Sequence, residues 1–192
     1  MPKLVLSACV CLVLSLSACS FSFGNSEEVD KANKLVNEGN VIQTEAEKLF
    51  SESTGKYDAI VKEAQSAENT FEELANKEEP LKALLGPLET AANKFREAAQ
   101  KSEDASKLKV EDWFKQYLSL RGELLRKEAE SVDVFSRMVK ITYDPSIETE
   151  EDFAAKLKEQ QTALENLGKQ KVDLKAKVDK LTADHKDDFK QQ

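Results

Sequence analysis

Residues that break helices and residues that carry reactive side chains are both scarce in this chain of 192 residues. It has 6 glycines, 4 prolines, one histidine and one tryptophan, and aromatic residues make up 7% of it. Few breakers beside abundant alanine, leucine, glutamate and lysine argue against sheets and favour long helices. No serine has a histidine near it in the sequence that could activate it as a nucleophile, and no glycine-rich loop that could bind a phosphate is present. We therefore expect no enzymatic activity and no cofactor.

Cysteine is confined to the beginning of the chain, at Cys9, Cys11 and Cys19. The first 18 residues have the form of an export signal, with Lys3 as the positive n-region and an apolar run from Leu4 to Leu16. That run is shorter than the roughly 20 residues that cross a bilayer. Removal of this leader leaves no cysteine pair, and therefore no intramolecular disulfide.

The leader ends in Leu16, Ser17, Ala18 and Cys19. An aliphatic residue and two small residues before a cysteine resemble the lipobox of bacterial lipoproteins. The resemblance implies that Cys19 receives a diacylglyceryl group and becomes the first residue of the mature chain. The same four letters end at Cys9, but cleavage there leaves almost no apolar run, so we reject that site.

This resemblance predicts a signal peptide over 1–18 and a lipidated tether over 19–25. The remaining residues, 26–192, are expected to form a helical bundle domain, on the periodicity described below. The resemblance also implies palmitate-type acylation and anchoring to a membrane of the cell envelope. In enterobacterial lipoproteins, aspartate after the cysteine signals retention in the inner membrane. Ser20 stands there instead, so the expected location is the outer membrane where the host has one.

Negative charge dominates the chain. The net charge is −8, from 28 basic and 36 acidic residues, and loss of Lys3 with the leader makes it −9. Such a chain is repelled by phosphate backbones, and no basic stripe with interleaved aromatic residues is present. We therefore expect no nucleic-acid partner.

Apolar residues recur at spacings of three and four along most of the mature chain, which predicts amphipathic helices. The fold expected is all-α: an elongated antiparallel bundle of about four long helices with coiled-coil-like packing. Ile60, Phe71 and Phe135 are candidate core residues. Polar residues interrupt the apolar seams at five places: Gln43, Ser53, Arg121, Gln160 and Lys171.

The ends of the helices are less evident than the seams. The first helix breaks either near Pro80 or, as an alternative, between Ser51 and Gly55, because the apolar phase runs through both places. A polar stretch over 102–109 predicts a loop. The pair Asp144-Pro145 ends the third helix, and Thr149 with Asp152 resembles a capping box for the last one.

Some residues could carry chemistry, and each has a structural interpretation that we favour. His185, with Asp184, Asp187 or Asp188, is a metal candidate, yet one histidine with loose carboxylates lacks the geometry of a zinc site. We predict a solvated helix end there and no metal. The acidic pairs Glu78-Glu79 and Glu150-Glu151 are expected at helix starts, where the dipole favours them.

The densest aromatic cluster is Trp113, Phe114 and Tyr117. It suits a recognition patch, but aromatic residues on a bundle face are more often core. The lysine-rich end resembles the lipoprotein that is linked to peptidoglycan through a terminal lysine. Here Lys190 is followed by Gln191 and Gln192, which argues against that covalent link.

The sequence thus favours a membrane-anchored lipoprotein that acts as a structural or interaction module, with an envelope protein or the cell wall as partner. The alternative is a ligand-binding or enzymatic bundle with a polar site between helices. That alternative requires polar groups from several helices to meet at one level of the bundle. Nothing in the heptads specifies an oligomeric state.

Overall fold

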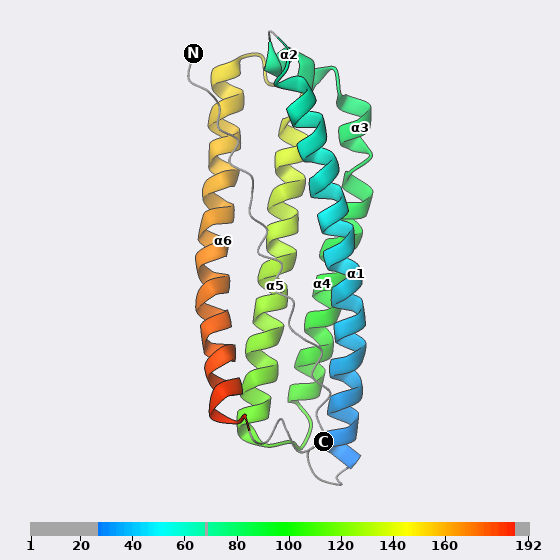
Figure 1. Cartoon of the computed structure of the whole chain (residues 1–192), viewed down its shortest axis with the longest axis vertical. Coiled ribbons are helices and arrows are strands. Elements are labelled where there is room, and N and C mark those ends of the chain that lie inside the picture. The colour runs from blue at the N-terminus through cyan, green and yellow to red at the C-terminus, as the bar shows by residue number, and fades with distance from the viewer. Residues whose placement is uncertain (1–26, 68, 187–192) are drawn as a thin grey trace.

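A computed structural model describes residues 27–67 and 69–186. Four long helices form the body of the protein: α1 (Glu27–Ala64), α4 (Leu85–Ser106), α5 (Asp112–Ile141) and α6 (Glu150–Asp184). Two short helices, α2 (Thr70–Ala75) and α3 (Glu78–Lys82), lie between α1 and α4. Successive long helices run in opposite directions, so the predicted antiparallel, elongated all-α bundle is confirmed (Figure 1).

Each long helix packs along the next one in the sequence, α1 on α4, α4 on α5 and α5 on α6. The two outer helices, α1 and α6, have no comparable contact with each other in the described part of the chain. A helix of 38 residues such as α1 is about 57 Å long at 1.5 Å per residue. Both α1 and α5 begin, and α6 ends, at the same end of the bundle (Figure 1).

The first helix ends at Ala64, which lies after the alternative break at Ser51–Gly55 and before the expected break near Pro80. The stretch from Ser51 to Gly55 is helical, so a break there is wrong. Its hydroxyls are accommodated inside the helix, because Ser53 donates to the carbonyl of Leu49 at 2.7 Å. Pro80 does lie in the connection to α4, in the first turn of α3, but the chain leaves α1 already after Ala64.

Local side-chain hydrogen bonds lie on both sides of this earlier break. The Ser66 hydroxyl donates to the carbonyl of Glu63 at 2.6 Å, and Asn69 accepts from the backbone N–H of Glu72 as the N-cap of α2. Such bonds offer the backbone an alternative to the helical ladder. The apolar seam continues through the break, which is why its phase alone did not reveal it.

Two other predicted ends can be compared with the structure. The expected loop over 102–109 is shorter, because α4 continues to Ser106 and α5 begins at Asp112. The N-cap of α6 is confirmed, since the Thr149 hydroxyl accepts from the backbone N–H of Asp152 at 3.2 Å. Helix α5 ends at Ile141, just before Asp144 and Pro145, as predicted.

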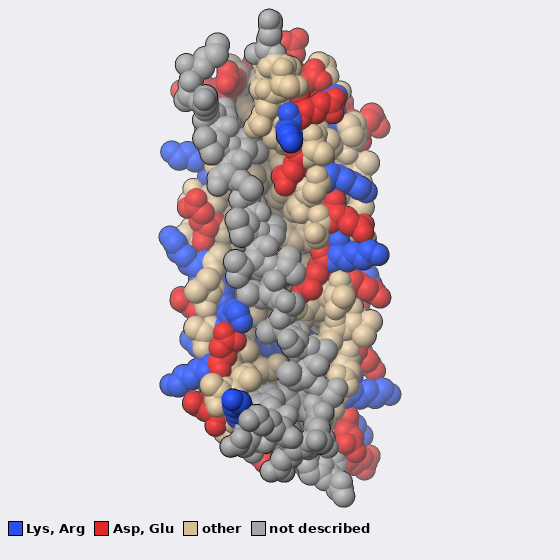
Figure 2. Space-filling view, in the orientation of Figure 1, with Lys and Arg blue, Asp and Glu red and all other residues tan. Residues whose placement is uncertain are grey.

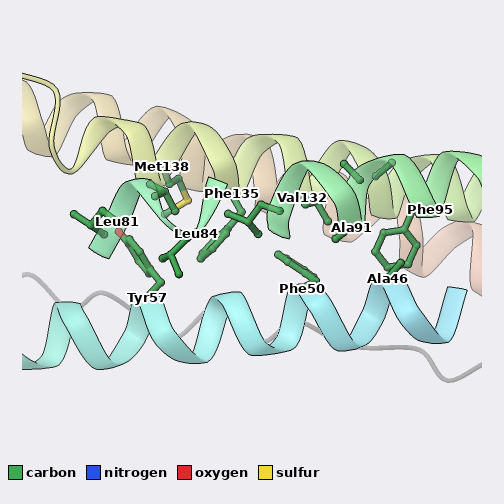
Figure 3. Close-up of a cluster of buried hydrophobic side chains, with 14 of the residues drawn as sticks. Ala46, Phe50, Tyr57, Leu81, Leu84, Ala91, Phe95, Val132, Phe135 and Met138 are labelled. Atoms are coloured by element: carbon green, nitrogen blue, oxygen red, sulfur yellow. The ribbon is translucent and has the colours of Figure 1, made fainter. Parts of the chain in front are cut away.

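The core consists of two apolar clusters that follow one another along the bundle. The larger cluster contains Phe50, Tyr57, Phe95 and Phe135 and continues toward the α2–α3 end (Figure 3). Phe135 is 3% exposed and meets the rings of Phe50 and Tyr57 edge-on, at centroid distances of 5.7 and 5.2 Å. Such edge-on pairs are favourable beyond the apolar area that they bury.

The smaller cluster fills the opposite end with residues of α1, α5 and α6, including Val29, Phe114 and Val178. Of the three candidate core residues, Phe135 is fully buried, whereas Ile60 and Phe71 are partly buried against the larger cluster. The prediction of a core position is therefore confirmed for Phe135 and too strong for the other two.

Close helix contacts are allowed by two glycines. A Cβ atom at Gly122 of α5 would meet the Glu103 side chain of α4 at 3.2 Å. One at Gly39 of α1 would meet the Lys101 side chain at 3.4 Å. Glycine at these positions lets α4 approach both of its neighbours closely, which places α4 at the centre of the α1–α4–α5 packing.

Candidate functional site

The residues that carry the lipoprotein resemblance, Leu16, Ser17, Ala18 and Cys19, lie outside the described residues. So do Asp187, Asp188 and Lys190 at the other end of the chain. These predictions are therefore not addressed by the structure. Among the residues that it does describe, no helix combines the length and the apolar character needed to cross a membrane.

The acidic pairs lie where the structural interpretation places them. Glu78 and Glu79 occupy the exposed first turn of α3, and Glu78 pairs with Lys82 at 2.5 Å. Glu150 and Glu151 occupy the exposed first turn of α6. Carboxylates at these positions interact favourably with the helix dipole.

His185 terminates α6 and contacts the aromatic cluster. Its ring stacks on Trp113 with a centroid distance of 4.3 Å and an interplanar angle of 8°. Within residues 27–67 and 69–186, no group of three histidine, cysteine or acidic side chains could hold a metal ion. The sequence predicted a solvated helix end here, whereas His185 is half-buried against the Trp113 ring.

The aromatic cluster is mainly core. Phe114 is 1% exposed and Tyr117 is 7% exposed, and both belong to the smaller apolar cluster. Trp113 differs from them because it is only half-buried. Its indole Nε1 donates to the carboxylate of Glu111 at 2.5 Å.

Polar residues from three helices meet in the interior between the two apolar clusters. Arg121 of α5 is 2% exposed and donates through Nη2 to the side-chain oxygen of Gln43, at 3.1 Å, and to that of Asn40, both on α1. Ser102 of α4 is also buried at this level, between Ala99 of the larger cluster and Ala105 of the smaller one. Its hydroxyl donates to the carbonyl of Ala98, which satisfies it within its own helix.

The hydrogen bonds continue from this pair toward the larger apolar cluster. Gln43 donates to the Glu47 carboxylate at 2.8 Å. One heptad after Arg121, Glu128 pairs with Lys171 of α6 at 3.0 Å, with side chains only 16% and 15% exposed. We call Asn40, Gln43, Glu47, Arg121, Glu128 and Lys171 the polar layer.

Burial raises the pKa of the Glu128 carboxyl above its ordinary value, although Lys171 opposes the shift and Glu47 adds to it. The two cations and two carboxylates of the polar layer sum to zero formal charge. The positive charge of Arg121 has no directly bonded carboxylate, because the two oxygens that accept from its guanidinium belong to neutral amides. The Nε of Arg121 also has no hydrogen-bond partner in the described structure. A buried, unsatisfied donor is unfavourable by about 1–3 kcal/mol.

Of the five polar interruptions found in the seams, Gln43 and Arg121 hydrogen-bond to each other, and Lys171 pairs with Glu128 one heptad further along the bundle. Ser53 donates to the carbonyl of Leu49 within its own helix, and Gln160 lies elsewhere and accepts from Arg137 at 2.9 Å. Sequence reasoning missed Asn40, Glu47 and Glu128, which lie beside the seams. The signal available for them was spacing, because 40 and 47 are one heptad apart, as are 121 and 128.

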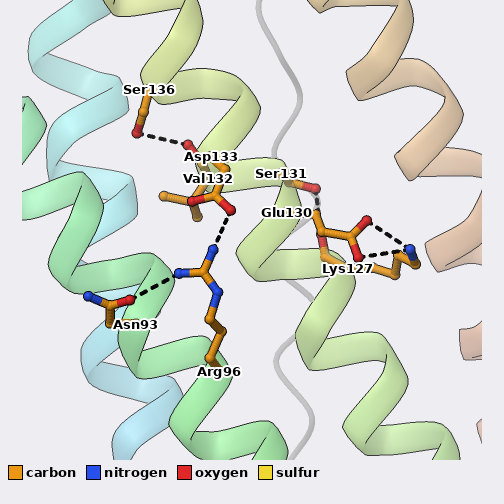
Figure 4. Close-up of polar contacts among 8 residues, drawn as sticks. All are labelled: Asn93, Arg96, Lys127, Glu130, Ser131, Val132, Asp133 and Ser136. Carbon is orange, nitrogen blue, oxygen red and sulfur yellow. Dashed lines mark hydrogen bonds and ion pairs between the residues drawn. The ribbon is translucent and has the colours of Figure 1, made fainter.

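The outer face of the bundle carries many charges of both signs (Figure 2). Several of them join neighbouring helices, as Lys101 of α4 does with Glu38 of α1 at 2.6 Å, and Arg126 of α5 with Glu103 of α4. Arg96 similarly links α4 to Asp133 of α5 (Figure 4). Exposed pairs of this kind contribute little each, about 0–1 kcal/mol.

Comparisons with known proteins identify no relative. No family model matches the chain, and neither a curated protein nor a solved structure is significantly similar to it. The fold defines an all-α helical bundle.

Proposed function

We propose that this protein is a bacterial lipoprotein anchored through Cys19 and that its helical bundle acts as an interaction module of the cell envelope. The observation that carries the proposal is the sequence Leu16-Ser17-Ala18-Cys19 at the end of a short apolar leader. Two or three acyl chains give stable anchoring to a membrane, whereas a single chain is marginal. The partner that we propose is an envelope protein or the cell wall.

Three buried serines of the described helices have structural partners. The buried serines Ser53, Ser102 and Ser131 donate to carbonyls of their own helices, at 2.7, 3.3 and 2.8 Å. We therefore interpret these three hydroxyls as structural. The function proposed is binding and tethering, without a covalent reaction of substrate.

The chain offers a matched pair of variants to test the anchor. Cys19→Ala should abolish incorporation of a labelled palmitate analogue and leave the leader uncleaved, as judged by the intact mass of the protein. Cys9→Ala, which alters the decoy with the same preceding residues, should be acylated and processed like the parent. Acylation that survives Cys19→Ala, or is lost in Cys9→Ala, would refute the anchor.

A second candidate function is supported by the polar layer. The buried Arg121, held by neutral amides and with an unpaired N–H, is the kind of group that binds an anionic ligand between helices. The experiment is Arg121→Met, which removes the charge but keeps an unbranched apolar side chain. If the layer is only structural, the variant loses stability, because the amide oxygens of Asn40 and Gln43 lose their donor, and any loss of phenotype follows the fall in melting temperature. Loss of the phenotype with unchanged melting favours the ligand site.

A further inference from the structure

One end of the bundle combines the three features that would bring it to a membrane surface. It is formed by the start of α1, the start of α5 with the segment before it, and the end of α6. We define the tether end as residues 27–36, 107–118 and 178–186. The smaller apolar cluster joins these segments, since Val29, Phe114 and Val178 pack in it together.

The first feature is the length of chain between the proposed lipid and the bundle. Cys19 precedes Glu27 by eight residues, which span at most about 29 Å when fully extended. The bundle is about 57 Å long, as judged by α1. An anchor at Cys19 therefore keeps the tether end near the bilayer, while the α2–α3 end is out of reach of the lipid when the bundle stands upright.

The second feature is the distribution of charge. The tether end contains seven acidic and seven basic residues. The end of α4, residues 100–106, lies at the same end of the bundle and adds Lys101, Glu103 and Asp104, so this whole end carries a formal charge of −1. The other eight of the nine negative charges expected for the mature chain fall on the remaining residues. Anionic headgroups repel a negative surface, and this end of the acidic protein is repelled least.

The third feature is Trp113, the only tryptophan of the chain. It is half-buried at the start of α5, stacked on His185 and hydrogen-bonded through its indole N–H to Glu111. Tryptophan has an apolar ring with one polar edge, and it is enriched where membrane meets water. Its neighbours Phe114 and Tyr117 are buried in the core, so Trp113 is the aromatic side chain of this cluster that is partly exposed.

We infer that the tether end rests on the lipid headgroup layer, with the Trp113–His185 pair in the interfacial zone and the bundle axis directed away from the membrane. This inference rests on the proposed acylation of Cys19. It goes further by fixing the orientation of the bundle, which presents the α2–α3 end and the charged sides of the helices to a partner.

The single tryptophan provides the test. The full acylated protein is reconstituted into phosphatidylcholine vesicles with or without lipids brominated on their acyl chains, which quench fluorescence on contact. Brominated lipid should lower the emission of Trp113, because a tryptophan at the membrane–water interface lies within contact of the upper part of the acyl chains. The matched control is Trp113→Phe combined with Phe71→Trp, which moves the probe to α2 at the other end; its emission should not change.

Each other outcome decides against the inference. Equal quenching of both probes means that the bundle lies flat on the bilayer, and quenching of the residue-71 probe alone means that it is inverted. Quenching of neither probe, in protein that floats with the vesicles, leaves the acylation intact but removes the membrane contact. Shielding of Trp113 from acrylamide in native membranes without quenching in vesicles means that a protein covers this end. Protein that neither floats nor carries acyl chains refutes the proposed function itself.

Discussion

The ring of Phe135 is the best single position at which to test the packing of the bundle. It is 3% exposed, comes from α5, and contacts the Phe50 and Tyr57 rings of α1 edge-on. Phe135→Ala removes these contacts and leaves a cavity, so the free energy of unfolding should fall by about 3–5 kcal/mol. Domains of this kind are stable by about 5–15 kcal/mol in total, so the effect is large.

Urea denaturation followed by far-ultraviolet circular dichroism measures this effect on the soluble form that begins at Ser20. Phe135→Leu keeps most of the volume and should lose less than about 1.5 kcal/mol. Val172→Ala is the control on the surface of α6, where the side chain is 61% exposed and the change should stay within about 0.5 kcal/mol. If Phe135→Ala unfolds at the same urea concentration as Val172→Ala, the assigned core of α1 and α5 is incorrect.

Three further predictions concern buried charge, helix capping and helix propensity. Burial raises the pKa of Glu128 above 4.5, so the ionised carboxyl lowers stability, and this loss disappears as pH falls from neutral toward 4.5. The melting temperature of the wild type, relative to that of Glu128→Gln, should therefore rise as pH falls over that range. A constant difference between the two melting temperatures contradicts the shift. Thr149→Ala removes the N-cap of α6 and should lower the free energy of unfolding by about 1 kcal/mol in urea melts, whereas no loss would mean that the cap is dispensable. Gly168→Ala, where a Cβ atom meets nothing within 4 Å, should raise it by about 0.5–1 kcal/mol, and destabilisation would show that α6 is packed more closely there than described.

The sequence predicted the helices well because their apolar periodicity is a direct consequence of burial. Residues such as Phe114, Leu124 and Val139 recur at the helical period and are all buried. The cap at Thr149 was also predictable, because an N-cap is a local interaction between neighbouring residues. The break after Ala64 was not predicted, since the apolar seam keeps the same phase on both sides of it.

The polar layer shows a different limit of sequence reasoning. Gln43, Arg121 and Lys171 stood out as polar residues in apolar seams, so their positions inside the bundle were evident. Their partners were not, because the pairing of Glu128 with Lys171 depends on how far α5 and α6 are shifted along each other. Periodicity within one helix does not determine that shift. Once the Glu128–Lys171 pair has formed, any other shift of α6 along α5 is unfavourable, because it separates the two buried charges.

Because an even number of long helices forms the bundle, the start of α1 and the end of α6 lie at the same end. If a membrane holds the amino terminus, as proposed, a partner that pulls on the carboxyl terminus loads the helices in an unzipping geometry. The contacts of α6 with α5 then break one turn at a time instead of shearing together, and each step requires little force. A partner bound at the α2–α3 end loads the same helices along their axes, where many turns resist at once, so the mechanical strength of the link depends on which end is held.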